Sequence, residues 1–263
     1  MVQEAYESHR EAYLQKNIAG LTADPSVKPQ ADQALLNHLS TSPGDTSRDA
    51  QDVNCMVIWA RPPPAVIAKI KDVQSRIRNH PRLGKDTVWL VPEEDLHLSI
   101  LELSHRHPTS HLRSVLNELG TDRMHSMLSV PSSLDEKPVL VRPRLGFDKL
   151  GFALSMVPSA DTRFTYHHLR ADLQRRALES GIAIDTCYTA LSAHVTIGRF
   201  TRDGFLDGDG ADDDLEWIRN LNAELEGDPV EWVVDELELQ LGFLKFGRSR
   251  GEAEYVSARA NGS

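Results

Sequence analysis

Two short segments of the chain alternate apolar and polar residues as a half-buried β-strand does, and each carries a histidine followed two positions later by a hydroxyl residue. These residues are His97 and Ser99 in the first segment, and His194 and Thr196 in the second. Because residues i and i+2 of a strand point to the same face, each segment presents an imidazole beside a hydroxyl. The opposite faces are leucine, isoleucine, valine and alanine. The pattern predicts two strands with one face packed in a core and one polar face.

The same His-x-Ser/Thr spacing occurs twice more, at His38 and at His107. Neither copy lies on an alternating segment: His38 ends a helix-like run, and His107 precedes a proline that reads as a turn. Among 11 histidines, roughly one or two such pairs are expected by chance. The two strand-borne copies are therefore the candidates for a functional site.

Composition limits the partners of the chain. A length of 263 residues with 40% hydrophobic content suffices for one core or a two-lobed core. The net charge is −10, with 39 acidic against 29 basic residues. A protein that tracks along a long nucleic acid needs a basic stripe, so a small nucleotide or a short RNA 3′ end is the expected partner.

The N-terminus resembles no secretory signal, and no apolar run approaches membrane-spanning length. We therefore expect no membrane partner, a cytoplasmic or alternatively nuclear location, and a monomer. Cys55 and Cys187 lie far apart and fit no metal-ligand spacing, so both are expected to be small buried hydrophobic residues.

Residues 1–50 read as a helical extension that is partly mobile, and residues 51–263 read as the globular domain. The domain alternates strand and helix patterns. Strands are expected at 54–60, 87–91, 95–101, 139–145, 151–157, 191–198, 230–246 and 254–258, and helices at 65–78, 110–127, 161–180 and 215–225. This order predicts an α+β fold, with helices outside two antiparallel sheets whose central strands carry the two histidines and face each other across a cleft.

The paired His-x-Ser/Thr strands resemble the 2H phosphoesterase superfamily, which includes 2′-5′ RNA-ligase-like proteins and the plant and fungal cyclic phosphodiesterases. The segment containing Trp59, followed by prolines, is similar to the first strand of the cyclic phosphodiesterases. The resemblance covers the layout of residues 54–259. It implies a bilobal, pseudo-twofold fold in which His97 and His194 come from opposite lobes, His97 as the acid and His194 as the base.

The chemistry follows from the residue types as well. Opening a 2′,3′-cyclic phosphate with water removes a proton from the water and gives one to the departing ribose oxygen. Two imidazoles with pKa values near 6.5 suit these two tasks, although the residues alone do not say which is the base. Ser99 and Thr196 would donate hydrogen bonds to the nonbridging oxygens. This mechanism requires no cofactor and no metal ion.

Three further residues could contact the substrate. Arg199 follows Thr196 by three positions, as in the RNA-ligase-like branch, but strict alternation turns it to the opposite face unless Gly198 marks a β-bulge. A surface or inter-lobe ion pair is its alternative role. Trp59, and Phe200 on the histidine face, could each stack on a base, or could be core aromatics.

Two charged clusters are expected to have no catalytic part. Arg170, Arg175 and Arg176 read as a solvated helix face, and the acidic loop 203–214 lacks the spacing of a calcium site.

The sequence thus predicts a metal-independent phosphodiesterase that hydrolyses a 2′,3′-cyclic phosphate at a nucleotide or RNA end, giving a 2′-phosphate. The alternative is a non-catalytic module that binds a nucleotide or RNA end on the same fold. A third reading is a coincidence of two motifs in an α+β domain of another function.

Overall fold

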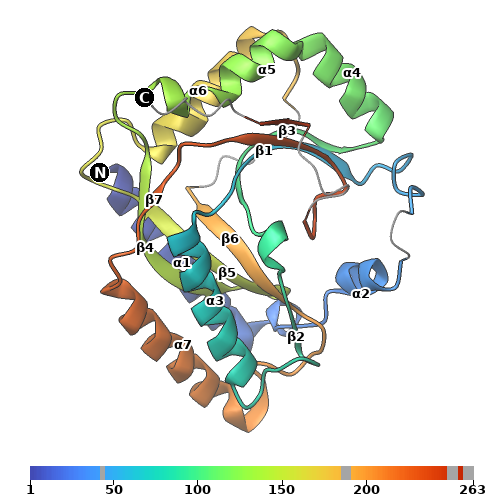
Figure 1. Ribbon diagram of the computed structural model, residues 1–263. Coiled ribbons are helices and arrows are strands. Elements are labelled where there is room, and N and C mark those ends of the chain that lie inside the picture. Colours follow the sequence, from blue (N-terminus) through green and yellow to red (C-terminus); the bar gives the residue numbers. More distant parts are fainter. Residues whose placement is uncertain (42–44, 185–190, 248–253, 257–263) are drawn as a thin grey trace.

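Two antiparallel sheets with helices packed on them form the part of the chain that the computed structural model describes, residues 1–41, 45–184, 191–247 and 254–256 (Figure 1). Sheet A contains, in spatial order, β3 (Leu98–His107), β1 (Asn54–Ala60), β8 (Glu238–Gly242) and β9 (Tyr255–Val256). Sheet B contains β2 (Val88–Leu90), β6 (Ala193–Phe200), β5 (Gly151–Pro158), β4 (Val139–Phe147) and β7 (Trp232–Val233). The expected α+β class with two antiparallel sheets is confirmed.

The α-helices cover these sheets. They are α1 (Val2–Ala23), α2 (Gln33–Leu39), α3 (Pro64–Asn79), α4 (Thr109–Leu119), α5 (Thr121–Leu128), α6 (Tyr166–Glu179) and α7 (Ala211–Glu226). Figure 1 shows α4, α5 and α6 over the curved strands of sheet A, with α3 and α7 beside sheet B. In α3 the apolar stripe Val66, Ile70, Val73 and Ile77 is buried, as its helical spacing requires.

Two expected elements are divided in the structure. The expected helix over 110–127 is two helices, because Gly120 between them has φ 81°, a conformation that ends α4. The expected strand over 230–246 is also wrong as one element, since it supplies β7 to sheet B and β8 to sheet A. The chain therefore crosses between the two sheets within this segment.

One of the two histidine strands holds a different position from the one expected. β6 is an inner strand of sheet B, but β3 is the edge strand of sheet A and is not central. His97 itself lies one residue before β3 and two residues after a short 3-10 turn over Glu93–Asp95.

Strand β3 carries three β-bulges, which change the period of its side chains. Its register against β1 skips one residue at each of Ile100, Leu103 and Arg106. Ser99, Glu102 and His105 consequently share one face although they are spaced three residues apart, and all the residues between them are buried. We call the face that carries Ser99, Glu102 and His105 the open face of sheet A.

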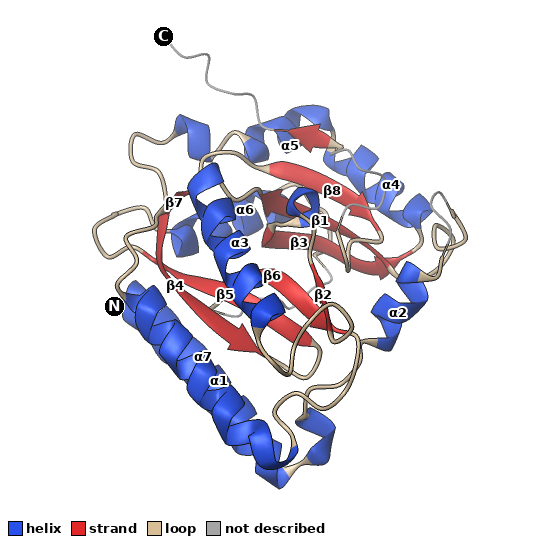
Figure 2. Ribbon diagram, turned by 60° about the horizontal axis from the view of Figure 1, so that its bottom comes forward, coloured by secondary structure: helices blue, strands red, loops and turns tan. Residues whose placement is uncertain are grey.

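The N-terminal helix α1 packs on the body of the protein. Tyr6, Leu14 and Leu21 are buried in the core, and Asn17 donates a hydrogen bond to the carbonyl oxygen of Phe147 in β4 at 2.7 Å. Figure 2 shows α1 and α7 beside β4 of sheet B. Residues of all three elements line one groove. The separation of residues 1–50 as an extension remains a prediction.

Candidate functional site

His97 is held in one orientation by a hydrogen bond and a stacked ring. Its Nδ1 lies 2.7 Å from the carbonyl oxygen of Asp95, so Nδ1–H is the donor and Nε2 carries the lone pair. Its ring stacks on the indole of Trp59, with 3.6 Å between centroids and 9° between planes. These two contacts fix both the tautomer and the plane of the imidazole.

The surroundings of His97 favour its neutral form. Burial lowers the pKa of His97 to about 3. The hydrogen bond to the Asp95 carbonyl acts in the opposite direction, and Arg61, His194 and Arg199 lower the pKa further. The imidazole is therefore unprotonated at neutral pH in the ligand-free protein.

Trp59 supports the histidine and does not face a ligand. Its side chain is 1% exposed, covered by the His97 ring, with the Arg61 guanidinium 5.1 Å from the indole centroid. Arg61 is fixed in turn by Glu238, whose Oε1 accepts from Arg61 Nε at 2.7 Å. The expectation that Trp59 stacks on a base is corrected, because no free ring face is left for a nucleotide.

His194 occupies the corresponding place in sheet B, on β6. A hydrogen bond of 2.8 Å joins its Nδ1 to the Ser192 hydroxyl. Burial lowers the pKa of His194; Asp148 opposes this shift, and Arg170 and Arg199 add to it. Like His97, the His194 imidazole is favoured in its neutral form.

Strand β3, which directly follows His97, approaches strand β6, which carries His194, although the two strands belong to different sheets. His194 is one of the groups that lower the pKa of His97, and the charge of Arg199 lowers the pKa of both histidines. The fold therefore brings together two histidines that are 97 residues apart in sequence, from 97 to 194.

The hydroxyl residues lie on the same faces as the histidines. Ser99 is on the open face of sheet A, directly across from Trp59 in the β1–β3 register, and its carbonyl accepts from Tyr166 at 3.4 Å. Thr196 pairs with Ala153 of β5 and lines a cavity with His194. Their roles toward a phosphate stay predictions.

Arg199 reaches the histidine face because β6 contains a bulge. Gly198 pairs with Phe152 and Thr196 with Ala153, so Ile197 is the extra residue. Arg199 therefore lines the same cavity as Thr196. It also donates a hydrogen bond to Asp32 Oδ2 at 3.0 Å, an ion pair with the N-terminal segment.

The same bulge turns Phe200 into the core. Phe200 is 0% exposed and packs edge-on against Phe152, with 5.0 Å between ring centroids, and lies 5.8 Å from Phe205. The expectation that Phe200 shares the histidine face and stacks on a base is wrong, because strict alternation was assumed across the bulge.

The prediction that Arg170 lies on a solvated helix face is wrong. It is 8% exposed, and its Nε donates to the carbonyl oxygen of Ile100 in β3 at 3.0 Å, so it is no part of a solvated face. Arg175 and Arg176 are the solvated members of that cluster, and both pair with Asp172 on the helix surface. Arg170 thus joins α6 to β3 and adds positive charge near His194.

The cavity beside His194 has a volume of about 370 Å³. His194, Thr196 and Arg199 line one part of it, and Tyr13 and Arg10 of helix α1 line another. Its size lies in the range of small-molecule sites, about 300–1,000 Å³. The N-terminal helix therefore forms part of the wall of the candidate site, a contribution that no motif in residues 1–50 indicated.

The backbone of this chain is similar to those of several solved structures, all at low sequence identity. Escherichia coli LigT, solved with 3′-AMP, is 12% identical with a TM-score of 0.41, covering 78% of this chain and 98% of that chain. The Thermus thermophilus protein TT0787 is 16% identical with a TM-score of 0.42, covering 75% of this chain and 99% of that chain. A structure described as a phosphoesterase is 12% identical with a TM-score of 0.39, covering 78% and 94%. No family model and no curated protein match the sequence.

Among the helices in the described part of the chain, none combines the length and the apolar character needed to cross a bilayer.

Proposed function

We propose that this chain is a phosphodiesterase that hydrolyses a 2′,3′-cyclic phosphate at a nucleotide or a short RNA 3′ end, with His97 and His194 as the acid–base pair and without a catalytic metal ion. One observation carries the proposal: two imidazoles, one directly before β3 and one on β6, are each held by a hydrogen bond at Nδ1, the two strands approach each other, and the charge of Arg199 lowers the pKa of both rings. Binding alone requires no such pair of proton carriers.

The proposed reaction balances protons through the two imidazoles. The neutral base accepts a proton from water as the water oxygen bonds to phosphorus. The protonated acid donates a proton to the ribose oxygen as its bond to phosphorus breaks. Following the resemblance, His97 is the acid and His194 the base, and the product is a 2′-phosphate. Ser99 and Thr196 donate to the nonbridging oxygens, where charge develops.

The acid must gain its proton when substrate binds. Burial and neighbouring cations keep His97 neutral in the free protein. An anionic phosphate beside the ring supplies the opposite charge, which favours the imidazolium form. Arg199 is placed to bind that phosphate, and neutralising its charge would also remove part of the effect that lowers both pKa values.

The test is the product formed from 2′,3′-cyclic nucleotides by purified protein in EDTA, separated by chromatography. The proposal predicts conversion to the nucleoside 2′-phosphate by the wild type and by His107→Ala, which removes the partly buried histidine of a His-x-Thr copy away from the site. His97→Ala and His194→Ala should each lose activity. Nucleotide binding in calorimetry with no product would instead establish the non-catalytic module.

A further inference from the structure

A second cluster of chemically active side chains lies on the open face of sheet A, further along β3 from His97. Because of the bulge at Leu103, Glu102 and His105 point to the same side of the strand. Cys55 of β1 is directly opposite His105 in the β1–β3 register. Strict alternation would place Glu102 and His105 on opposite faces, so sequence spacing alone does not bring these three residues together.

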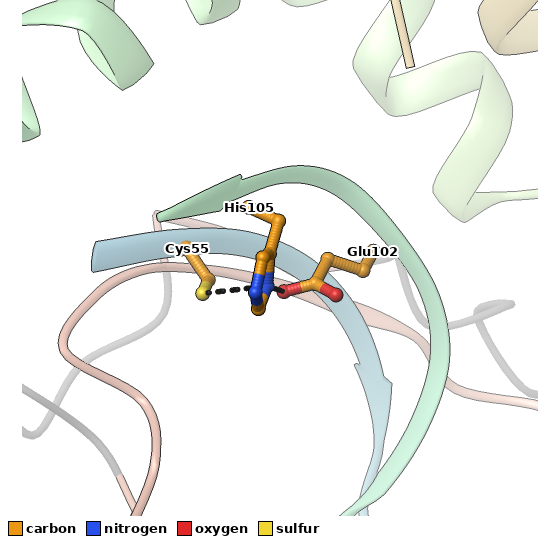
Figure 3. A group of neighbouring side chains, drawn as sticks. All are labelled: Cys55, Glu102 and His105. Atoms are coloured by element: carbon orange, nitrogen blue, oxygen red, sulfur yellow. Dashed lines mark hydrogen bonds and ion pairs between the residues drawn. The ribbon is translucent and has the colours of Figure 1, made fainter. Parts of the chain in front are cut away.

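The three side chains converge on one point. Figure 3 shows them turned toward one another, on the side of β1 and β3 away from the helices. The distance from Cys55 Sγ to His105 Nδ1 is 3.7 Å, and from His105 Nδ1 to Glu102 Oε1 it is 2.8 Å. All three donor atoms lie within 4.8 Å of one another. The ligand atoms of a tetrahedral zinc ion are separated by roughly 3.5 Å, so small side-chain movements suffice.

The donor set selects the kind of metal. A thiolate, an imidazole and a carboxylate are ligands of zinc and similar transition metals, whereas magnesium and calcium prefer oxygen donors alone. The carboxylate and the thiolate together balance the charge of a divalent ion. Cys55 is partly exposed, contrary to the expectation of a small buried hydrophobic residue, and this exposure gives an ion access to the sulfur.

We propose that Cys55, Glu102 and His105 form a site for one Zn²⁺ ion, with three protein ligands and a water molecule in the fourth position. Binding deprotonates the thiol, so one proton is released for each Cys55–zinc bond formed. In the free protein His105 Nδ1–H donates to Glu102; on binding, this proton leaves Nδ1 and the neutral ring carries its proton on Nε2, so that the Nδ1 lone pair can coordinate the ion. The three ligands are not residues of the proposed phosphate site, and Glu102 lies two register positions from Ser99, roughly 7 Å along the strand.

Cobalt titration of the purified, chelator-treated full-length protein tests this site. Co²⁺ bound to a thiolate gives a charge-transfer absorption in the near ultraviolet, so the wild type should show this band, saturate at one ion per chain, and lose it when Zn²⁺ is added. Cys55→Ser should abolish the band. Cys187→Ser, the matched control that removes the other cysteine of the chain, should leave it unchanged.

The two other ligands are tested by affinity. Outer-shell partners of a metal contribute about 10–100-fold to affinity, so removing a ligand itself should cost at least about 100-fold. Glu102→Gln and His105→Ala should therefore weaken Zn²⁺ binding by that factor, with unchanged circular dichroism.

Three results would overturn the proposal. They are a wild type without the charge-transfer band, a band that survives in Cys55→Ser, and zinc affinity unaffected by Glu102→Gln and His105→Ala. Each would leave a hydrogen-bonded surface triad only. The outcome is independent of the proposed hydrolysis, which is measured with EDTA present.

Discussion

At the scale of single residues, the stacked contact between Trp59 and His97 has a testable consequence. The indole centroid of Trp59 lies 3.6 Å from the imidazole centroid of His97, and the indole has no exposed face. Trp59 therefore positions the histidine. Trp59→Leu should lower kcat by roughly 10–100-fold, because a displaced catalytic group can cost that much, and should leave KM nearly unchanged. Trp59→Phe, which keeps a flat ring, should recover part of kcat. Steady-state kinetics in which Trp59→Leu raised KM at constant kcat would indicate base stacking instead.

The lowered pKa of His97 also predicts how stability depends on pH. The unfolded chain binds a proton at this residue below about pH 6.5, whereas the folded protein does so only near pH 3. Between these values the unfolded state binds more protons, so stability falls as pH falls. At pH 5 this residue alone should cost about 2 kcal/mol relative to pH 7.5, at about 1.4 kcal/mol per pH unit.

Urea denaturation of the wild type and His97→Gln at both pH values isolates this effect. Other histidines with lowered pKa values, such as His80 and His167, are common to both proteins and cancel in the difference. The variant should lose about 2 kcal/mol less than the wild type on acidification. An equal loss in the two proteins would show that His97 titrates near its ordinary pKa.

At the scale of elements, the bulges decide which side chains share a face. Alternation in the sequence correctly places His194 with Thr196, because no bulge lies between them. It fails for Phe200 and misses Glu102 with His105, because each assignment crosses a bulge. The residue types around a bulge rarely reveal where the extra residue lies. In β6, Gly198 did indicate the position of a bulge.

The glycines of the β4–β5–β6 region provide a test of this local geometry. A Cβ on Gly151 would lie 2.2 Å from the carbonyl oxygen of Gly198, in backbone that cannot move away. Gly151→Ala should therefore destabilise the protein by about 3 kcal/mol, at the upper end of overpacking costs. Gly146→Ala in β4, whose Cβ would be 4.0 Å from its nearest neighbour, should cost about 1 kcal/mol or less. Equal urea midpoints for the two variants would contradict this description of the β5–β6 contact.

At the scale of the whole molecule, the order of the strands in the two sheets could not be predicted from the sequence. Local patterns located β1 and the β4–β5 hairpin, since both depend on neighbouring residues. The position of β3 at a sheet edge, and the passage of the chain from β7 to β8, depend on long-range pairing that a local window does not contain. Long-range packing also decides that helix α1 forms part of the cavity wall.

Asp32 connects distant parts of the chain. Its carboxylate accepts a hydrogen bond of 3.0 Å from the backbone N–H of Ala34, at the start of α2. The same carboxylate forms ion pairs with Arg199 of β6 and with Lys245. Asp32 is 2% exposed, and Asp32→Asn removes its buried charge from two cations while an amide oxygen can still cap the helix. The free energy of unfolding, measured in urea, should therefore fall by about 2 kcal/mol. Asp207→Asn, in an exposed pair with Lys28, should cost less than about 1 kcal/mol. A loss at Asp32 no larger than at Asp207 would contradict a connecting role.

The central claim is that His97 and His194 act as a unit on one phosphate, and a double-variant rate measurement tests it most directly. Turnover of a 2′,3′-cyclic nucleotide in EDTA should fall by about 10²–10⁴-fold in His97→Ala and in His194→Ala. The double variant should be about as slow as the slower single variant, because groups that act together are strongly non-additive. Losses that multiply in the double variant, or full turnover by either single variant, would contradict the account.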